Sequence, residues 1–224
     1  IYQINPGSIA IIKKASFVER KYYSLDFSRN KFEGDFSEAK YLFRDFLEQS
    51  VALRLRSDVE VGVYLSGGLD SSIISLLSHK YNKNVKTFSV EFDSTEYDES
   101  NYQNDFHKLL NTNHHALRIS SNDIVNNFRK ALWHAEKPVF RTAFVPMFML
   151  SKMVKNSDIK VVLTGEGADE LFLGYDIFKE SLYRSIWGNL NNNQKNIALE
   201  SIYPYLKNLN KISTNRLFEE YSSE

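Results

Sequence analysis

The sequence predicts an α/β fold in which a mostly parallel sheet carries helices on both faces and is followed by a helical tail. Two observations lead to this prediction. β-rich runs alternate with stretches of helical apolar spacing between residues 36 and 163, and two glycine-containing loops each follow a β-rich run directly. Such alternation is typical of a parallel sheet, whose ligand site lies beyond the carboxyl ends of its strands. We therefore expect both loops at one edge of the sheet.

The elements follow in order along the chain. Residues 1–34 carry short β-prone runs at 8–12 and 21–25, which we interpret as an edge or a linker. From Phe36 the apolar spacing predicts an amphipathic helix with a buried face, ending near Arg56. The next elements are predicted as a strand at 59–65, a helix through 73–77, a strand at 85–92, helix 99–110, strand 115–119, helix 123–135, helix 146–155 and strand 159–163. The tail from about Tyr175 has no clear strand and is predicted to be helical.

The composition excludes several classes of function. The 224 residues include 28 Lys plus Arg and 28 Asp plus Glu, so no net charge draws the chain onto nucleic acid or an anionic membrane. There is no cysteine, which removes thiol nucleophiles, thiolate metal sites and disulfides and favours a cytoplasmic location. The densest apolar stretch, residues 144–150, is far shorter than the roughly 20 residues that span a bilayer. We expect no nucleic-acid or membrane partner, and because the chain starts at Ile1 we expect its numbering to begin inside a longer polypeptide.

The first loop, residues 66–72 (SGGLDSS), has the composition of a phosphate cradle. Its two glycines let the backbone turn sharply and point N–H groups inward, and its three serine hydroxyls add donors. The helix that follows presents its positive end to a bound anion. The alternative is a plain tight turn followed by a helix cap. The strand before the loop and the helix after it favour the phosphate cradle.

The second loop, residues 164–171 (TGEGADEL), brings three carboxylates to the same sheet edge as Asp70. A carboxylate beside a phosphate repels it unless a cation lies between them, so Asp70 and Asp169 are predicted to hold Mg²⁺ against phosphate oxygens. Glu166, free of the metal, is predicted to act as a general base or to orient a substrate. The alternative is an ordinary acidic helix start, where Asp and Glu favour the helix dipole. Two such loops in one sheet make that alternative less favourable.

Residues 66–72 resemble the pyrophosphate loop of N-type ATP pyrophosphatases, and residues 163–171 resemble the second signature of glutamine-dependent asparagine synthetases. The first loop is shared with GMP and NAD synthetases and tRNA-modifying enzymes, whereas the second is specific to asparagine synthetases and their β-lactam synthetase relatives. The resemblance implies a Rossmann-like fold of the adenine nucleotide alpha hydrolase type. It also implies three segments: a remnant of a glutaminase domain and a linker at 1–34, an ATP-pyrophosphatase synthetase core at 35–180, and a truncated helical part at 181–224.

By this resemblance, the side-chain carboxylate of aspartate attacks ATP to give β-aspartyl-AMP and pyrophosphate, and ammonia then displaces AMP to form asparagine. The implied cofactor is Mg²⁺, held by Asp70 and Asp169. The implied catalytic residues are Glu166, Asp169 and Arg141, although Arg141 also fits a plain surface arginine. The implied nucleotide contacts are Leu65, Ser66, Gly67, Gly68, Asp70, Ser71, Ser72, Val90, Thr164 and Gly165.

The chain departs from the family pattern in three ways. It lacks the cysteine nucleophile of the glutaminase, so ammonia must come from solution, or from a glutaminase domain on a missing N-terminal segment or a separate chain. The family's Arg-x-Pro-Phe-Leu-Asp-like substrate segment and its downstream catalytic lysine are not found before Glu224. Leu173 stands where the family usually has a second glycine.

Several alternatives stay open. The chain could serve a related amidotransferase acting on another small carboxylate in a polysaccharide or secondary-metabolite pathway, or it could be a nucleotide-binding fragment that is inactive in isolation. Other N-type pyrophosphatases are disfavoured by the second loop. A homodimer is left open. His114 and His115 point to opposite faces of a predicted strand, so we expect surface or capping roles for them and no metal site.

Overall fold

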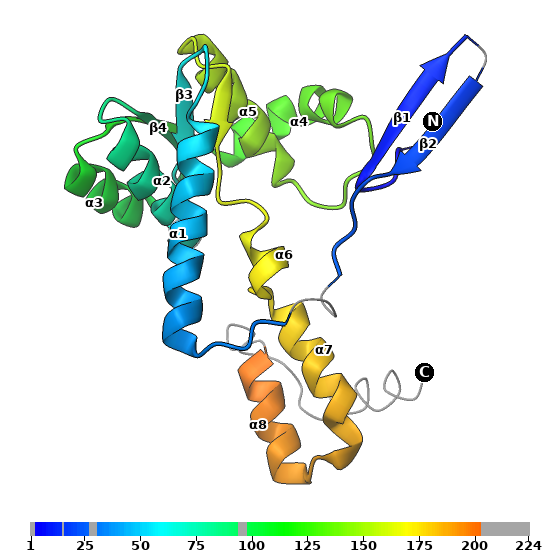
Figure 1. Ribbon diagram of the computed structural model, residues 1–224. Coiled ribbons are helices and arrows are strands. Elements are labelled where there is room, and N and C mark those ends of the chain that lie inside the picture. Colours follow the sequence, from blue (N-terminus) through cyan, green and yellow to red (C-terminus); the bar gives the residue numbers. More distant parts are fainter. Residues whose placement is uncertain (1–2, 15, 27–30, 94–97, 203–224) are drawn as a thin grey trace. The chain divides into compact units, whose positions relative to one another are not determined.

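The computed structural model describes residues 3–14, 16–26, 31–93 and 98–202 (Figure 1). The chain divides into two compact units, Ile1–Gln49 and Ser50–Glu224. The three segment boundaries expected from the sequence stay predictions.

The first unit contains a β-hairpin and most of a long helix. Strands β1 (Ser8–Lys13) and β2 (Ser16–Lys21) pair antiparallel, with Ser8 opposite Lys21. The prediction of a strand at 21–25 is wrong, because the chain already turns at Lys14, which has a left-handed φ of 51°. Helix α1 (Phe36–Arg54) is confirmed, and Asp35 caps it by accepting a hydrogen bond from the Glu38 backbone N–H at 2.8 Å. Its expected buried face is not buried throughout, since Phe43 and Phe46 are exposed.

The second unit is built on a four-stranded parallel sheet, which confirms the predicted fold class. The strands are β3 (Val61–Tyr64), β4 (Lys86–Phe92), β5 (Asn113–Ile119) and β6 (Val161–Leu163), in the spatial order β5-β4-β3-β6. The chain thus moves from β3 through β4 to β5 and returns to add β6 on the other side of β3. Such a reversal of strand order opens a crevice at the carboxyl ends of the strands. Both glycine loops begin there, one after β3 and one after β6.

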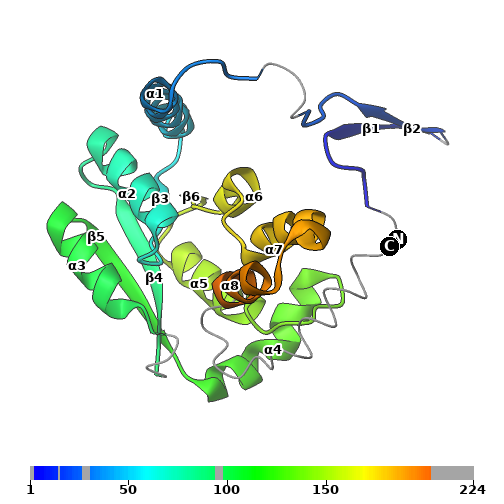
Figure 2. The same ribbon diagram turned by 90° about the horizontal axis from the view of Figure 1, so that it is seen from below.

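Helices cover both faces of this sheet (Figure 2). Helices α2 (Leu69–Tyr81) and α3 (Ser100–Leu110) lie on one side and contact β3 and β4, respectively. Helix α5 (Phe144–Asn156) packs on β4 and β5 from the other side, and α4 (Ser121–Ala135) packs on α5. The core between α5 and the sheet is a cluster of Phe88, Leu150, Val154 and Ile159. These side chains remove the apolar face of β4 from water and fix where its carboxyl end lies.

The described part of the tail is helical, as predicted. It consists of α7 (Asp176–Ile186), the short 3-10 helix η1 (Trp187–Asn189) and α8 (Asn192–Ile202), and it follows the short helix α6 (Ala168–Phe172) that ends the acidic loop. Trp187, Leu199 and Ile202 form a separate buried cluster between η1 and α8. Residues 203–224, the last part of the tail, in which the sequence shows no counterpart of the family's catalytic lysine, lie outside the described residues. Among the described helices, none combines the length and the apolar character needed to cross a membrane.

Candidate functional site

A cavity of about 430 Å³ opens at the carboxyl ends of β3, β4 and β6. The glycine loop after β3 forms one wall and the acidic loop after β6 forms another, as expected from the reversal of strand order. Most of the site residues predicted from the sequence line this cavity: Leu65, Ser66, Gly68, Asp70, Ser71, Val90, Thr164, Gly165, Glu166 and Asp169.

Three predicted site residues do not line it. Gly67 packs against α3 instead: its φ is +90°, and a β-carbon there would come within 3.0 Å of the Tyr102 β-carbon. The Ser72 backbone N–H donates to the Gly68 carbonyl at 3.1 Å inside the first turn of α2. Arg141 is exposed in the segment between α4 and α5. Its role in catalysis stays a prediction.

The glycine loop is held in shape by its own serines. The hydroxyl oxygens of Ser66 and Ser71 lie 2.9 Å apart, and the Ser71 hydroxyl also receives a hydrogen bond from the Ser66 backbone N–H at 3.1 Å. The Ser66 hydroxyl accepts from the Gly68 backbone N–H at 3.2 Å. Gly68, at the N-cap of α2, has no side chain with which to cap the helix. No side chain therefore caps α2, and the positive end of this helix, where Gly68 and Ser71 line the cavity, suits an anion.

The two loops meet at Gly165. A β-carbon built on this residue would lie 2.8 Å from the Ser71 backbone nitrogen and 2.9 Å from the Asp70 β-carbon. Real β-carbons do not approach other atoms so closely, so only glycine fits here. The contact places the backbone of the acidic loop directly against the first turn of α2.

The acidic loop sends two of its three carboxylates to the cavity. Glu166 and Asp169 line it, and Asp169 also accepts a hydrogen bond at its backbone carbonyl from Gly174 N–H at 3.0 Å. Glu170 does not line the cavity and instead accepts a hydrogen bond from the Tyr175 hydroxyl at 3.0 Å. This bond to a carboxylate is the main reason that the pKa of Tyr175 is raised.

The metal site predicted from the sequence consists of two carboxylates, Asp70 and Asp169. Within the described residues, no group of three or more His, Cys, Asp or Glu side chains is arranged to hold a metal ion. Asp70 and Asp169 line the same cavity as a pair. Mg²⁺ is commonly bound in proteins by one or two carboxylates together with substrate phosphate oxygens, so a pair of carboxylates beside the glycine loop would fit that ion.

Some cavity residues were missed by the sequence analysis. Gln103, on α3, is only 3% exposed and lines the cavity, as do Ser89, Tyr64 and Tyr175. Gln103 lies in an ordinary amphipathic stretch, and no motif distinguishes it. Ser89 had a weak signal, since it directly precedes the predicted contact Val90 at the end of a strand.

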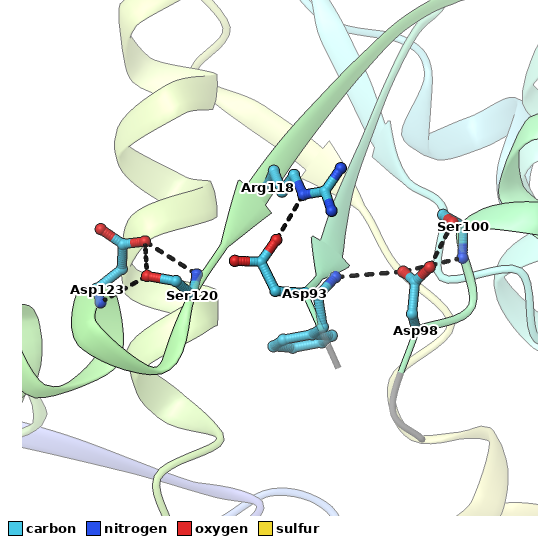
Figure 3. A network of polar contacts seen from close by, with 7 residues as sticks. Asp93, Asp98, Ser100, Arg118, Ser120 and Asp123 are labelled. Carbon is cyan, nitrogen blue, oxygen red and sulfur yellow. Dashed lines mark hydrogen bonds and ion pairs between the residues drawn. The ribbon is translucent and has the colours of Figure 1, made fainter. Parts of the chain in front are cut away.

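A carboxylate joins α3, the helix that carries Gln103, to the sheet (Figure 3). Asp98 accepts hydrogen bonds from the Phe92 backbone N–H at 3.2 Å and from the Ser100 hydroxyl at 2.6 Å, so it joins the end of β4 to the start of α3. The bond from Ser100 is the main cause of the lowered pKa of Asp98. Beside it, Arg118 on β5 donates to Asp93 at 2.5 Å. The Asp98 contacts fix the start of α3, and with it Gln103, relative to β4, whereas the Arg118 contact joins β5 to the end of β4.

The first turn of α4 is fixed in a similar way by a capping box between Ser120 and Asp123 (Figure 3). The Ser120 hydroxyl donates to the Asp123 carboxylate at 2.6 Å, which is the main cause of the lowered pKa of Asp123. Both acids are therefore charged in the folded chain at neutral pH.

The expectation of a surface or capping role is wrong for His114. Its ring nitrogens lie 2.9 Å from the Thr87 hydroxyl and 3.0 Å from the Ser89 hydroxyl, and its ring stacks on His107 with 4.6 Å between centroids. Thr87 is fully buried and Ser89 is 2% exposed. Partial burial, with smaller contributions from His107 and His115, lowers the pKa of His114 to about 4. His114 is thus a neutral hydrogen-bonding residue behind the cavity wall.

Comparison with known proteins identifies the family of this chain. The family model for asparagine synthase matches residues 42–222. The chain is 33% identical over 183 residues to asparagine synthetase [glutamine-hydrolyzing] 1 of Bacillus subtilis, covering 81% of this chain and 28% of that protein. It is 33% identical over 178 residues to asparagine synthetase B [glutamine-hydrolyzing] of Escherichia coli, covering 72% of this chain and 32% of that protein.

Other similar proteins bear different names. Amidase chyE of Penicillium rubens is 30% identical over 200 residues, with 81% of this chain and 30% of that protein covered. Among solved structures, an NH3-dependent NAD synthetase from Campylobacter jejuni aligns with a TM-score of 0.41 and 16% identity over 85% of this chain and 96% of that one. The chain spans about a third or less of the length of these curated relatives. Because the family model matches most of its residues, the chain belongs to the asparagine synthase family.

Proposed function

We propose that this chain forms the site of ATP-dependent amide synthesis in an enzyme of the asparagine synthetase type. In this proposal the side-chain carboxylate of aspartate is activated as an acyl-adenylate, and ammonia converts it to the amide. The observation that carries the proposal is the contact of Gly165 with Ser71, which joins a phosphate-type loop and an acidic loop in the wall of one cavity.

The glycine loop is the proposed binding place for the β- and γ-phosphates. Its backbone N–H groups, the serine hydroxyls and the uncapped end of α2 all favour an anion. Ser66 and Ser71 hydrogen-bond each other, so they can exchange that bond for one to phosphate oxygens without leaving a buried group unpaired. The end of β4 at Val90 is the proposed contact for the adenine ring, on the resemblance of this strand edge to the family.

Asp70 and Asp169 are the proposed ligands of Mg²⁺. Bound between them and the phosphates, the ion would neutralise charge that builds up on the leaving pyrophosphate. Asp70 sits in the first turn of α2, so its position relative to the phosphate cradle is set by the helix itself. Glu166 lines the same cavity and is exposed, which leaves its carboxylate able to orient a substrate or accept a proton.

The proposed reaction has two balanced steps. An oxygen of the aspartate side-chain carboxylate attacks the α-phosphorus of ATP, the α–β phosphoanhydride bond breaks and pyrophosphate leaves. Ammonia then attacks the acyl carbon, the bond to AMP breaks and the surplus proton goes to a base, for which Glu166 is the candidate. The chain's own contribution is chiefly positioning and charge neutralisation.

The source of ammonia is proposed to lie outside this chain. It contains no cysteine, so a glutaminase using that nucleophile would have to be another domain or another polypeptide. The cytoplasmic location stays a prediction, and the question whether the chain forms a homodimer stays open.

A related activity on another small carboxylate is the second candidate. It is favoured by the similarity to proteins named as amidases in Penicillium rubens and Gibberella zeae, which match the chain as broadly as the Bacillus subtilis protein does. The two loops do not indicate which carboxylate substrate the cavity accepts.

The test is to supply the full-length protein with Mg-ATP and ammonium, with and without aspartate, and to follow AMP and pyrophosphate by phosphorus NMR. Release of both products only with aspartate is the expected result. Release that requires a different carboxylate would favour the second candidate. ADP and phosphate as products would contradict the pyrophosphatase chemistry altogether.

A further inference from the structure

Gln103 joins the two parts of the cavity wall that lie at the ends of β3 and β4. Its side-chain amide nitrogen is 3.1 Å from the Ser66 carbonyl oxygen and 3.1 Å from the Val90 carbonyl oxygen. Both of these residues line the cavity, and Gln103 itself does so while being only 3% exposed. One side chain from α3 thus holds the glycine loop and the strand edge together.

The orientation of this amide is fixed by its two partners. A carbonyl oxygen accepts hydrogen bonds and cannot donate one, so only the NH₂ group can face both Ser66 and Val90. Its two N–H bonds are directed about 120° apart, which allows one bond to each carbonyl. Rotation of the amide by half a turn would bring three oxygens together. The side chain therefore acts as a rigid spacer between two backbone positions.

Holding these two carbonyls leaves the other end of the amide unsatisfied. The Gln103 Oε1 atom is buried and has no hydrogen-bond partner among the described residues. A buried acceptor without a partner opposes folding, so stability alone does not account for a glutamine here. An apolar side chain of similar length would fill the same space without that penalty, but it would release Ser66 and Val90.

The packing of α3 strengthens the connection. A β-carbon on Gly67 would come within 3.3 Å of the Gln103 backbone nitrogen, so the glycine loop rests directly on this turn of the helix. The start of α3 is in turn joined to the end of β4 through Asp98. Backbone packing and the Gln103 amide thus act on the same two segments.

We propose that Gln103 is a positioning residue that sets the distance between the phosphate-binding loop and the strand edge that contacts adenine. The inference rests on the proposed function, since it assigns the two segments to the two ends of ATP. A ligand that spans both segments gains from their correct spacing, because its second contact forms at a high effective concentration. A ligand that occupies one segment gains nothing from that spacing.

The test compares ATP with its two halves on the full-length protein. Isothermal titration calorimetry would measure the Kd of Mg-ATP, of inorganic pyrophosphate with Mg²⁺, and of adenosine, for the wild type and for Gln103→Met. Methionine keeps the length of the side chain and removes both N–H donors. We expect the Kd of ATP to rise at least fivefold, with those of pyrophosphate and adenosine unchanged within twofold.

Asn127→Leu is the matched control. It also replaces a helical amide with an apolar side chain, and Asn127 donates within α4 to the Asp123 carbonyl, away from the cavity. All three Kd values should stay at the wild-type level in this variant. If Gln103→Met does not fold, Gln103→Asn keeps the amide but is one methylene too short to reach both carbonyls, and the same pattern is expected.

Three other outcomes would contradict the proposed role of Gln103. An unchanged Kd for ATP in a folded Gln103 variant would overturn the positioning role. An equal loss of affinity for ATP, pyrophosphate and adenosine would also overturn it, because that is the result of general damage to the fold. A wild-type protein that binds none of the three would refute the proposed function itself, and with it this inference.

Discussion

Gly165 lies against Ser71 so closely that a β-carbon on Gly165 would come within 2.8 Å of the Ser71 backbone nitrogen. These two residues belong to loops that follow β6 and β3, which are neighbours in the sheet although about a hundred residues of chain separate them. The contact makes the glycine loop and the acidic loop a single structural unit. A substitution of Gly165 should therefore disturb the conformation of both loops.

Gly165→Ala is expected to move the acidic loop away from α2. The new β-carbon would overlap backbone atoms of the first turn of α2, and overpacking of this kind costs about 1 to 3 kcal/mol of stability. The affinity for Mg-ATP should fall by about tenfold or more, because displacement of the acidic loop would move Asp169 away from Asp70. Denaturant unfolding and calorimetric titration measure the two effects.

Gly188→Ala is the control for that substitution. A β-carbon on Gly188 would have no atom within 4 Å, and its backbone is not in the left-handed region. This variant should keep wild-type ATP affinity. Equal ATP affinity in the Gly165 and Gly188 variants would contradict the importance of the contact between the loops.

The effect of Asp70→Asn on ATP affinity is expected to have opposite signs with and without Mg²⁺. In the proposed site the Asp70 carboxylate repels phosphate when no cation is present and holds Mg²⁺ when it is, so the variant should bind ATP more tightly than the wild type in EDTA and more weakly in Mg²⁺. AMP formation should fall by about two orders of magnitude or more. Calorimetry in both buffers and an AMP assay check the two parts of the prediction.

The control for charge alone is Asp105→Asn, an exposed carboxylate on α3 that does not line the cavity. It should leave ATP binding unchanged in both buffers. An Asp70→Asn protein that behaves like this control would exclude Asp70 as a metal ligand.

The sheet and the two loops were predictable from sequence because their signals are local. β3 and β4 are buried parallel strands and therefore read as continuous β-rich runs, and glycine-containing loops follow β3 and β6. The hairpin strand β2 was misplaced because its turn uses Lys14 at a positive φ, where no glycine or asparagine gives a signal.

The residues that were missed owe their place to neighbours far along the chain. Gln103 is 37 residues from Ser66, and His114 is 25 residues from Ser89. Periodicity within α3 or β5 cannot reveal such pairs, because they arise only when parallel strands bring distant segments together. His114 was misjudged for this reason: the alternation of side chains along β5 was predicted, but not the hydroxyl groups that β4 presents to it.

Leu173→Gly is expected to stabilise the protein. Leu173 ends α6 with a φ of 58°, a left-handed conformation that costs a residue with a side chain roughly 1 to 2 kcal/mol. Its side chain is 62% exposed, so little burial is lost. After the greater chain entropy of glycine is subtracted, the gain should be about 0.5 to 1 kcal/mol, which thermal unfolding would detect as a rise in Tm of about 1 to 4 °C.

Leu171→Gly provides the matched comparison within the same helix. Leu171 is 54% exposed but has a helical backbone, so glycine there should destabilise by about 1 kcal/mol. The two variants are thus expected to change Tm in opposite directions. A decrease for both would show that the left-handed cap is not strained.

The stability of the folded chain should fall as the pH is lowered from about 6.5 to about 4, because of His114. Its pKa is about 4 in the folded chain and near 6.5 when unfolded, so within this window the unfolded state binds a proton that the folded state does not. The loss should be on the order of 1 to 2 kcal/mol once the partial exposure of the ring is taken into account. Urea unfolding at pH 7, 5.5 and 4.5 measures it.

His114→Gln should flatten this part of the profile, since glutamine does not titrate and can still hydrogen-bond with Thr87 and Ser89. His134→Gln, an exposed imidazole on α4, should keep the wild-type profile. Asp98 and Asp123 do not interfere, because their lowered pKa values place their loss of stabilisation below pH 3.8. A wild-type profile in His114→Gln would mean that His114 is not the group that titrates. A flattened profile would show that the folded chain favours the neutral ring, the form that lies between the Thr87 and Ser89 hydroxyls.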